Sequence, residues 1–275
     1  MKINQEEEKK EYNLSSDIIS NSEIGLINEN NFCYMNGILQ ILFHTKPFID
    51  IFIKEIKEKN ILKNQSKYPI STQFFYLINK INLITLSPSN ERKIISPFYF
   101  AQNFFRLSNN FKNGEQDDAE RFIRNFLELI SNELNNCFSN LFYGIIQTQT
   151  YLQCGDLQST QENSEFLDIP IPVPKQNENF VILDYLYSKF LKENKFSSNR
   201  KCNLCHKKKI FIEKCKLIKF PIILILTIQR LIYNNYCKSI THIEIPNNIS
   251  LGNNIYELYA INIHSGSPYY GHYYS

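Results

Sequence analysis

The hydrophobic pattern of this chain changes partway along its 275 residues, and the change limits the folds that it can adopt. Up to about residue 138, apolar residues recur every three or four positions, notably over residues 50–62, 73–83 and 115–130, which predicts amphipathic helices. Beyond residue 143, apolar and polar residues alternate over 167–173 and 256–263, which predicts strands. An apolar run at 220–228 predicts a buried central strand. This order favours an α+β protein with a candidate site in the cleft between a helical and a strand-rich half.

Composition and charge narrow the classes of partner. With 43% hydrophobic residues, the chain has enough apolar surface for one sizeable core or two joined subdomains. A formal net charge of +3 is too small to make nucleic acid or an anionic membrane the main partner. The apolar run at 220–228 has about half the length that a helix needs to cross a bilayer. We therefore expect neither a nucleic-acid-binding nor a membrane protein.

The first residues and the cysteine count predict where the protein acts. Residues 1–22 begin with a mixed-charge run and no apolar core, so we expect a solvated tail that is neither a secretory signal nor an anchor. The seven cysteines are an odd number and indicate free or metal-bound thiols in a reducing compartment. The expected location is the cytoplasm, the nucleus or both.

Cys33 lies where nucleophilic thiols are found. It follows a polar, Asn-rich segment, residues 25–32, and begins a predicted helix whose apolar residues include Tyr34, Ile38 and Leu39. A thiol at a helix N-terminus is close to unpaired N–H groups and to the positive end of the helix dipole, and both favour the thiolate. A single cysteine is otherwise usually a small buried apolar residue, so this segment leaves both interpretations open.

The end of the chain offers a partner for this thiol. A strand pattern leads into a Gly-rich turn, in which His272 stands between Gly271 and Tyr273. A glycine beside a reactive group lets another backbone approach closely. An early cysteine with a distant late histidine is the order expected of a papain-like thiol hydrolase, although a histidine in a Tyr-rich turn is commonly structural.

Five segments, in order along the chain, resemble motifs of the ubiquitin-specific proteases. Residues 25–40 (GLINENNFCYMNGILQ) are similar to the cysteine box of that family, and residues 256–274 are similar to its histidine box. Residues 116–123, 166–172 and 202–231 supply the three matches between them. The resemblance spans about residues 23–275 and implies a papain-like cysteine protease fold. It divides that domain into a helical thumb, about residues 25–138, and a β-rich palm with zinc-ribbon-like fingers, about residues 139–275.

The resemblance also implies a mechanism. Cys33 would be the nucleophile of a cysteine-type deubiquitinase, and His272 the base that takes its proton and later protonates the leaving amine. Asn28 matches the asparagine that stabilises the oxyanion, and His264 is expected to be structural. The family's third catalytic residue, Asp or Asn, would lie beyond Ser275 with the closing strands, so we expect a domain truncated just after the histidine box.

The substrate implied is the C-terminal tail of ubiquitin, which ends in Gly-Gly and bears arginines, on ubiquitinated proteins. Asp118 matches the residue that pairs with those arginines, with Gln116 beside it. Gly271 would let the diglycine pass through a channel too narrow for side chains, and Tyr273 joins these residues as a substrate contact. Arg121 departs from the family, which has Glu there.

Other interpretations stay open at this point. The missing third catalytic residue and the departure at Arg121 also allow a catalytically impaired pseudoprotease that binds ubiquitin. Phe32, next to Cys33, is a further departure, since the family has Thr there. Cys202-x-x-Cys205 is half of a zinc knuckle, and Cys154 occupies one place of the other half. These three thiols could hold a structural zinc. Alternatively, Cys202 and Cys205 could belong to a metal- or cofactor-binding module with no hydrolase role. Catalysis itself would require no cofactor.

Overall fold

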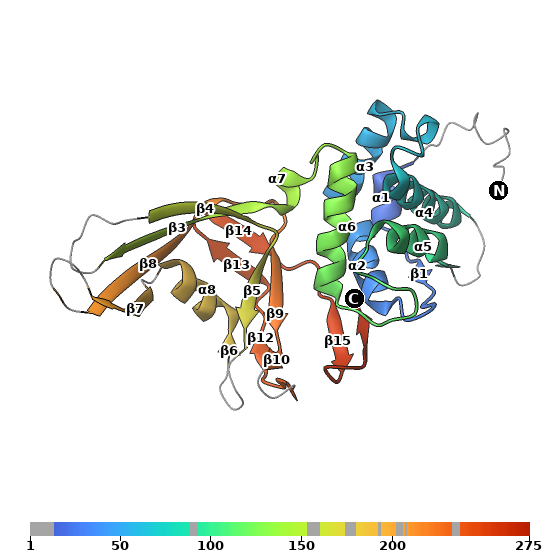
Figure 1. The fold of residues 1–275 in the computed structure, drawn as a ribbon. Helices are drawn as coiled ribbons and strands as arrows, with labels where there is room; N and C mark the ends of the chain where they lie inside the picture. The colour runs from blue at the N-terminus through green and yellow to red at the C-terminus, as the bar shows by residue number, and fades with distance from the viewer. Residues whose placement is uncertain are drawn as a thin grey trace. The chain divides into compact units, whose positions relative to one another are not determined.

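The computed structural model describes residues 14–87, 93–152, 160–173, 180–191, 194–201, 206, 208–232 and 237–275. These residues belong to two compact units, which we call the helical unit and the strand unit. The helical unit runs to Phe138 and includes residues 260–266 and 270–275. The strand unit contains residues 139–259 and 267–269. Helices and sheets segregate along the chain (Figure 1), which confirms the predicted α+β class.

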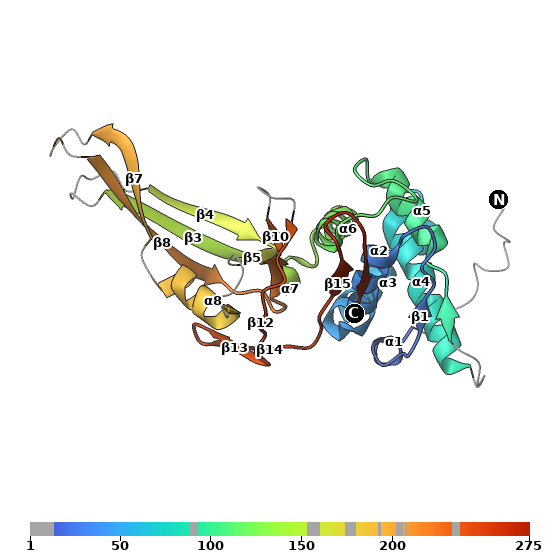
Figure 2. The same cartoon turned by 90° about the horizontal axis from the view of Figure 1, so that it is seen from below.

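The helical unit contains most of the helices and ends with a hairpin from the C-terminus of the chain (Figure 2). Strands β1 and β2 form a parallel pair, and β15 and β16 an antiparallel one. The elements are α1 (Ser16–Ser20), β1 (Gly25–Leu26), α2 (Cys33–His44), α3 (Lys46–Glu58), η2 (Ile61–Lys63), α4 (Pro69–Leu86), β2 (Ile94–Ile95), α5 (Phe98–Leu107), α6 (Ala119–Glu133), β15 (Ile263–Gly266) and β16 (Gly271–Tyr274).

Phenylalanine rings fill the core of the helical unit. Phe74 on α4 is fully buried and lies within 6.1 Å, between ring centroids, of rings on four other helices. Edge-on, tilted and offset-stacked ring pairs stabilise a core beyond the burial of their area. The partners of Phe74 are Phe43 (α2), Phe48 and Phe52 (α3), Phe100 (α5) and Phe126 (α6).

The expected N-terminal tail is wrong for residues 14–22. Within them α1 forms, and Ile19 on its inner face is fully buried. Ser15 caps this helix by accepting the Ile18 N–H at 3.4 Å, and its own N–H donates to Asn82 Oδ1 on α4 at 3.3 Å. A single buried isoleucine in a polar stretch gives no periodic signal, so the pattern missed this helix. Residues 1–13 lie outside the described part of the chain.

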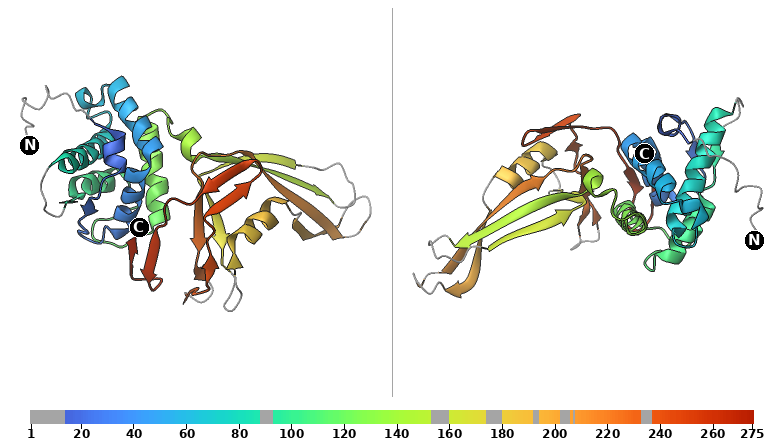
Figure 3. Two further views of the ribbon diagram at one scale, coloured as in Figure 1. Left: turned by 180° about the vertical axis from the view of Figure 1, so that it is seen from behind. Right: turned by 90° about the horizontal axis from the view of Figure 1, so that it is seen from above.

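The strand unit is built on a four-stranded antiparallel sheet with the order β4-β3-β8-β7 (Figure 3). Helix α8 packs on β8, and β5 pairs with β9 in parallel. The elements are α7 (Ser139–Phe142), β3 (Gly144–Leu152), β4 (Thr160–Phe166), β5 (Asp168–Pro172), β6 (Phe180–Val181), α8 (Ile182–Leu191), β7 (Asn194–Lys201), β8 (Lys208–Lys219), β9 (Ile225–Gln229), β10 (Leu231–Ile232), β11 (Cys237–Lys238), β12 (Ile243–Glu244), β13 (Asn248–Leu251) and β14 (Asn254–Glu257).

Two of the predicted strands differ from the structure. The apolar run at 220–228 becomes strand only at Ile225, and β9 is half-buried and pairs with β5 alone among the described strands. The alternating run at 256–263 is interrupted, because β14 ends at Glu257 and β15 begins at Ile263. The division between the two units falls within that run. Among the helices that the structure describes, none is long and apolar enough to span a membrane.

Candidate active site

Cys33 is the first residue of α2, as the sequence predicted. The loop before it turns through two left-handed residues, Asn30 (φ 47°) and Asn31 (φ 63°), a conformation that asparagine tolerates better than most residues. Phe32 occupies the N-cap and offers no side-chain acceptor to the first turn. Its ring is fully buried 5.7 Å from that of Phe105. The departure from Thr at this position therefore fills the core instead of capping the helix.

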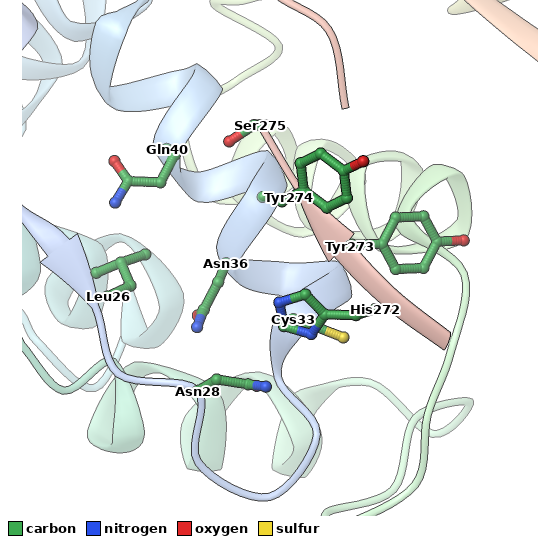
Figure 4. Close-up of a pocket in the computed structure, with 10 residues that line it drawn as sticks. Leu26, Asn28, Cys33, Asn36, Gln40, His272, Tyr273, Tyr274 and Ser275 are labelled. Carbon is green, nitrogen blue, oxygen red and sulfur yellow. The ribbon is translucent and has the colours of Figure 1, made fainter. Parts of the chain in front are cut away.

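Asn28, Cys33 and His272 line one pocket of the helical unit. Figure 4 shows that they reach it from three segments: Asn28 from the loop after β1, Cys33 from α2 and His272 from β16. Cys33 is a free thiol with 4% of its surface exposed. The structure thus brings together the three residues to which the resemblance assigned catalysis, within one unit. The rest of the lining is Leu26, Asn36, Gly37, Gln40, Tyr273, Tyr274 and Ser275.

The strand that carries His272 is held by the loop before α6. Gln116 exchanges two hydrogen bonds with the backbone of Gly271, at 3.1 and 3.2 Å. The hydroxyl of Tyr273 donates to Asp118 Oδ2 at 3.2 Å. Burial, reinforced by the charge of Asp118, raises the pKa of Tyr273, so this hydroxyl keeps the proton that it donates.

The four predicted substrate residues therefore contact one another in pairs. Asp118 also caps α6, since its Oδ1 accepts the N–H groups of Glu120 at 2.7 Å and Arg121 at 3.2 Å. Gly271 has a reason to be glycine that is independent of any substrate. A Cβ at this position would collide with His264 Nε2 and lie 2.5 Å from the Ser265 carbonyl oxygen. Contact of these four residues with substrate stays a prediction.

The positive charge of Arg121 is locally compensated. Its Nη1 lies 2.7 Å from Asp117 Oδ1, four residues earlier, and its Nη2 donates to the Asn110 carbonyl at 3.2 Å. The guanidinium carbon also lies 4.9 Å from the centre of the Phe111 ring, a cation–π geometry. Arg121 is thus turned into its own loop, and Asp118 keeps its carboxylate for the helix cap and Tyr273.

Asn36 is a pocket residue that the sequence reasoning did not single out. It lies one turn after Cys33, is 8% exposed, and donates from Nδ2 to the Ile27 carbonyl at 3.1 Å. This hydrogen bond fixes the peptide just before Asn28. The Asn36 Oδ1 atom is buried without a hydrogen-bond partner, which is costly in a protein interior. A polar residue within the first turns of a mostly apolar helix, three positions after the candidate nucleophile, was the available signal.

Gly37 lets another segment approach α2. A Cβ at this position would collide with Asn262 Oδ1, which lies just before β15. A glycine inside a predicted helix commonly marks such a close approach. Asn262 thus occupies the space that a side chain at position 37 would need.

The three cysteines predicted to bind zinc, Cys154, Cys202 and Cys205, lie outside the described residues. Within the described ranges, no group of three or more His, Cys, Asp or Glu side chains is arranged to hold a metal ion. A structural zinc stays a prediction from the sequence.

Comparisons with known proteins agree with this geometry. A family model described as ubiquitin carboxyl-terminal hydrolase matches residues 24–275. Ubiquitin carboxyl-terminal hydrolase 2 of Rattus norvegicus is 25% identical over 298 residues, which cover 90% of this chain and 47% of that protein. Ubiquitin carboxyl-terminal hydrolase 20 of Arabidopsis thaliana is 28% identical over 277 residues, which cover 90% of this chain and 37% of that protein. The chain thus spans half the length or less of these relatives.

Solved structures show the same fold. A chain of the SAGA Ubp8/Sgf11/Sus1/Sgf73 DUB module bound to ubiquitin aldehyde matches with a TM-score of 0.72 and 23% identity, over 94% of this chain and 62% of that chain. The module bound to monoubiquitin matches with a TM-score of 0.73 and 22% identity, over the same shares. The predicted papain-like fold is confirmed. Because the family model runs from just before Asn28 and Cys33 through His272 to the last residue, this chain belongs to the ubiquitin carboxyl-terminal hydrolase family.

Proposed function

We propose that this chain is a cysteine-type deubiquitinase, which hydrolyses the bond after the C-terminal Gly-Gly of ubiquitin in ubiquitin conjugates. The observation that carries the proposal is the pocket shared by Asn28, Cys33 and His272 within one compact unit. Membership of the ubiquitin carboxyl-terminal hydrolase family supports it. Because the nucleophile and the base are both side chains, the reaction requires no cofactor.

The proposed reaction proceeds in two stages. His272 takes the proton of Cys33, and the thiolate attacks the terminal glycine carbonyl carbon, whose oxygen becomes an oxyanion. The Asn28 carboxamide and the backbone N–H groups of the first turn of α2 donate hydrogen bonds to that oxygen. His272 then protonates the leaving amine, and a thioester to ubiquitin remains. In the second stage His272 activates a water, which releases ubiquitin with a free carboxylate and restores the thiol.

The surface beside this pocket suits the ubiquitin tail. Asp118 is exposed, and an ionised carboxylate has more acceptor positions than its three hydrogen bonds to Tyr273 and to the start of α6 occupy. We propose that these positions receive an arginine of the tail. Since the mechanism requires a reduced Cys33, we also propose that the protein acts in the cytoplasm or the nucleus, where thiols stay reduced.

A single labelling experiment tests the proposal. The purified chain is incubated with ubiquitin that carries a thiol-reactive group at its C-terminus, alongside Cys33→Ala and Cys237→Ala variants. Cys237 is an exposed thiol of the strand unit, so its removal should leave the adduct unchanged. An adduct that disappears only with Cys33→Ala supports the enzyme. Ubiquitin binding without an adduct would identify the alternative, a pseudoprotease, and the absence of both would refute any ubiquitin-directed role.

A further inference from the structure

The loop before α6 holds the backbone on both sides of His272. Gln116 engages both ends of its carboxamide with Gly271: Nε2 donates to the Gly271 carbonyl at 3.1 Å, and the Gly271 N–H donates to Oε1 at 3.2 Å. On the other side of the histidine, the Tyr273 hydroxyl donates to Asp118 at 3.2 Å. These contacts join residues 155 positions apart in the sequence, so no local propensity requires them.

The hairpin that carries His272 depends on such contacts. Strand β16 pairs only with β15 among the described strands, and an isolated two-stranded hairpin is marginally stable in water. One face of β16 packs on α2. This packing alone does not fix where the strand lies along the helix, so hydrogen bonds to other segments must do so. Gln116 supplies two of them at the residue adjacent to His272.

The same loop is also fixed to the segment that carries the nucleophile. Asn31, two residues before Cys33, donates from Nδ2 to the Gly114 carbonyl at 2.9 Å. Residues 114–118 therefore contact the cysteine segment at one end and the histidine strand at the other. A short loop that contacts both segments can define the distance between a thiol and an imidazole.

We infer that Gln116 is a positioning residue, which holds the Gly271 peptide and so sets His272 against Cys33, and that it is not a contact for the ubiquitin tail. This inference rests on the proposed deubiquitinase function. Displacement of a catalytic group by about 1 Å can reduce a rate roughly 100-fold. Loss of Gln116 should therefore lower kcat and leave ubiquitin affinity nearly unchanged.

Gln116→Glu separates positioning from substrate binding. Glutamate keeps an acceptor for the Gly271 N–H, but its second oxygen replaces the donor and faces the Gly271 carbonyl. It also adds a negative charge beside Asp118, which would favour an arginine-bearing tail. Gln116→Asn keeps the carboxamide but is one methylene too short to span the same gap. Gln102→Glu, at an exposed position of α5 in the same unit, is the matched charge control.

The variants are assayed by steady-state cleavage of a ubiquitin conjugate and by ubiquitin affinity in a Cys33→Ala background. We expect Gln116→Glu and Gln116→Asn to lower kcat by about 10- to 100-fold, with KM and affinity within about threefold of the parent and Gln102→Glu unchanged. A KM that rises while kcat stays constant would overturn the inference and make Gln116 a ubiquitin contact. So would unchanged kinetics.

A measurement without ubiquitin separates this inference from the proposed function. The rate at which iodoacetamide alkylates Cys33 is followed at one pH, with the modified peptide identified by mass spectrometry. An imidazole placed beside the thiol promotes the reactive thiolate, so both Gln116 variants should be alkylated several-fold more slowly than Gln102→Glu. The proposed function fails if the parent neither cleaves nor labels ubiquitin. The positioning role fails separately if the Gln116 variants and Gln102→Glu are alkylated at Cys33 at equal rates.

Discussion

Glu133 provides the sharpest stability test in the helical unit. It is the last residue of α6, where a negative charge is unfavourable for its own helix dipole. Its carboxylate instead caps the N-terminus of α4, accepting the N–H of Ile70 at 2.9 Å and that of Ser71 at 2.8 Å. Both of those residues are fully buried. Glu133→Ala therefore leaves two buried N–H groups with no acceptor in the described structure.

The loss of stability expected for Glu133→Ala can be estimated from these two hydrogen bonds. A buried donor left without a partner costs about 1–3 kcal/mol, and two of them set an upper range near 2–6 kcal/mol. Burial of the carboxylate raises the pKa of Glu133. Desolvation of the charge therefore already offsets part of the stability that the two hydrogen bonds provide. We therefore expect Glu133→Ala to lower the free energy of unfolding by about 2 kcal/mol. Glu133→Gln keeps one acceptor and should lose about half as much.

Urea unfolding followed by far-UV circular dichroism measures this loss, because the helical unit holds most of the helices. Glu128→Ala, an exposed substitution on the same helix, is the control and should change stability by less than about 0.5 kcal/mol. Amide exchange at residues 70 and 71 should accelerate in Glu133→Ala alone. A Glu133→Ala variant as stable as Glu128→Ala would refute the capping argument.

The difference in stability between the parent and Glu133→Ala should change with pH in a defined direction. A carboxyl group whose pKa is raised by folding binds more protons in the folded state, so its contribution to stability falls as pH rises through the folded pKa. The ordinary value for this group is 4.5. The stability advantage of the parent over Glu133→Ala should therefore be larger at pH 5 than at pH 7. An advantage that grows toward pH 7 would contradict burial as the main cause of the shift.

Three further outcomes are expected. Asn36→Leu removes a buried amide whose Oδ1 has no partner, so the thermal midpoint should stay the same or rise. Turnover should fall about tenfold or more, because the Asn28 peptide loses its hydrogen bond, and equal turnover would contradict a positioning role. Gly271→Ala should lower turnover by displacing β16, and His264→Ala should restore it only in part, because the Ser265 carbonyl also obstructs the new Cβ; full restoration would contradict this. Burial raises the pKa of Cys137 to about 12, so mass spectrometry should find it unalkylated at pH 7.5 in the folded protein.

The sequence predicted the elements whose signal is local and periodic. Helix α2 begins at Cys33, as the apolar spacing after it indicated. Helix α6 follows the predicted apolar pattern to Glu133, but it begins at Ala119 and not near residue 115, because Asp118 caps it there. The motif resemblance identified Asn28, Cys33 and His272, which the structure places in one pocket. Residues with a chemically required identity and a fixed register leave the clearest trace in a single sequence.

What the sequence missed depends on contacts between distant segments. Ile19 on α1 is buried by helices that follow it, and the apolar pattern of its own segment is too short to show this. The alternation over 256–263 is a correct local signal, but the chain passes from one unit to the other within it, so a single strand cannot form. The pairing of Gln116 with Gly271 is likewise absent from any local pattern.

The interrupted chain path of the helical unit has a consequence for synthesis and folding. The hairpin that carries His272 belongs to a unit whose other residues end at Phe138, so the whole strand unit is translated between them. Closing a contact across so long an intervening segment is slow and entropically costly. The nascent chain thus carries Cys33 through synthesis of residues 139–259 before the segment with His272 is made. The pocket that Asn28, Cys33 and His272 share can therefore form only after the strand-unit residues have been translated.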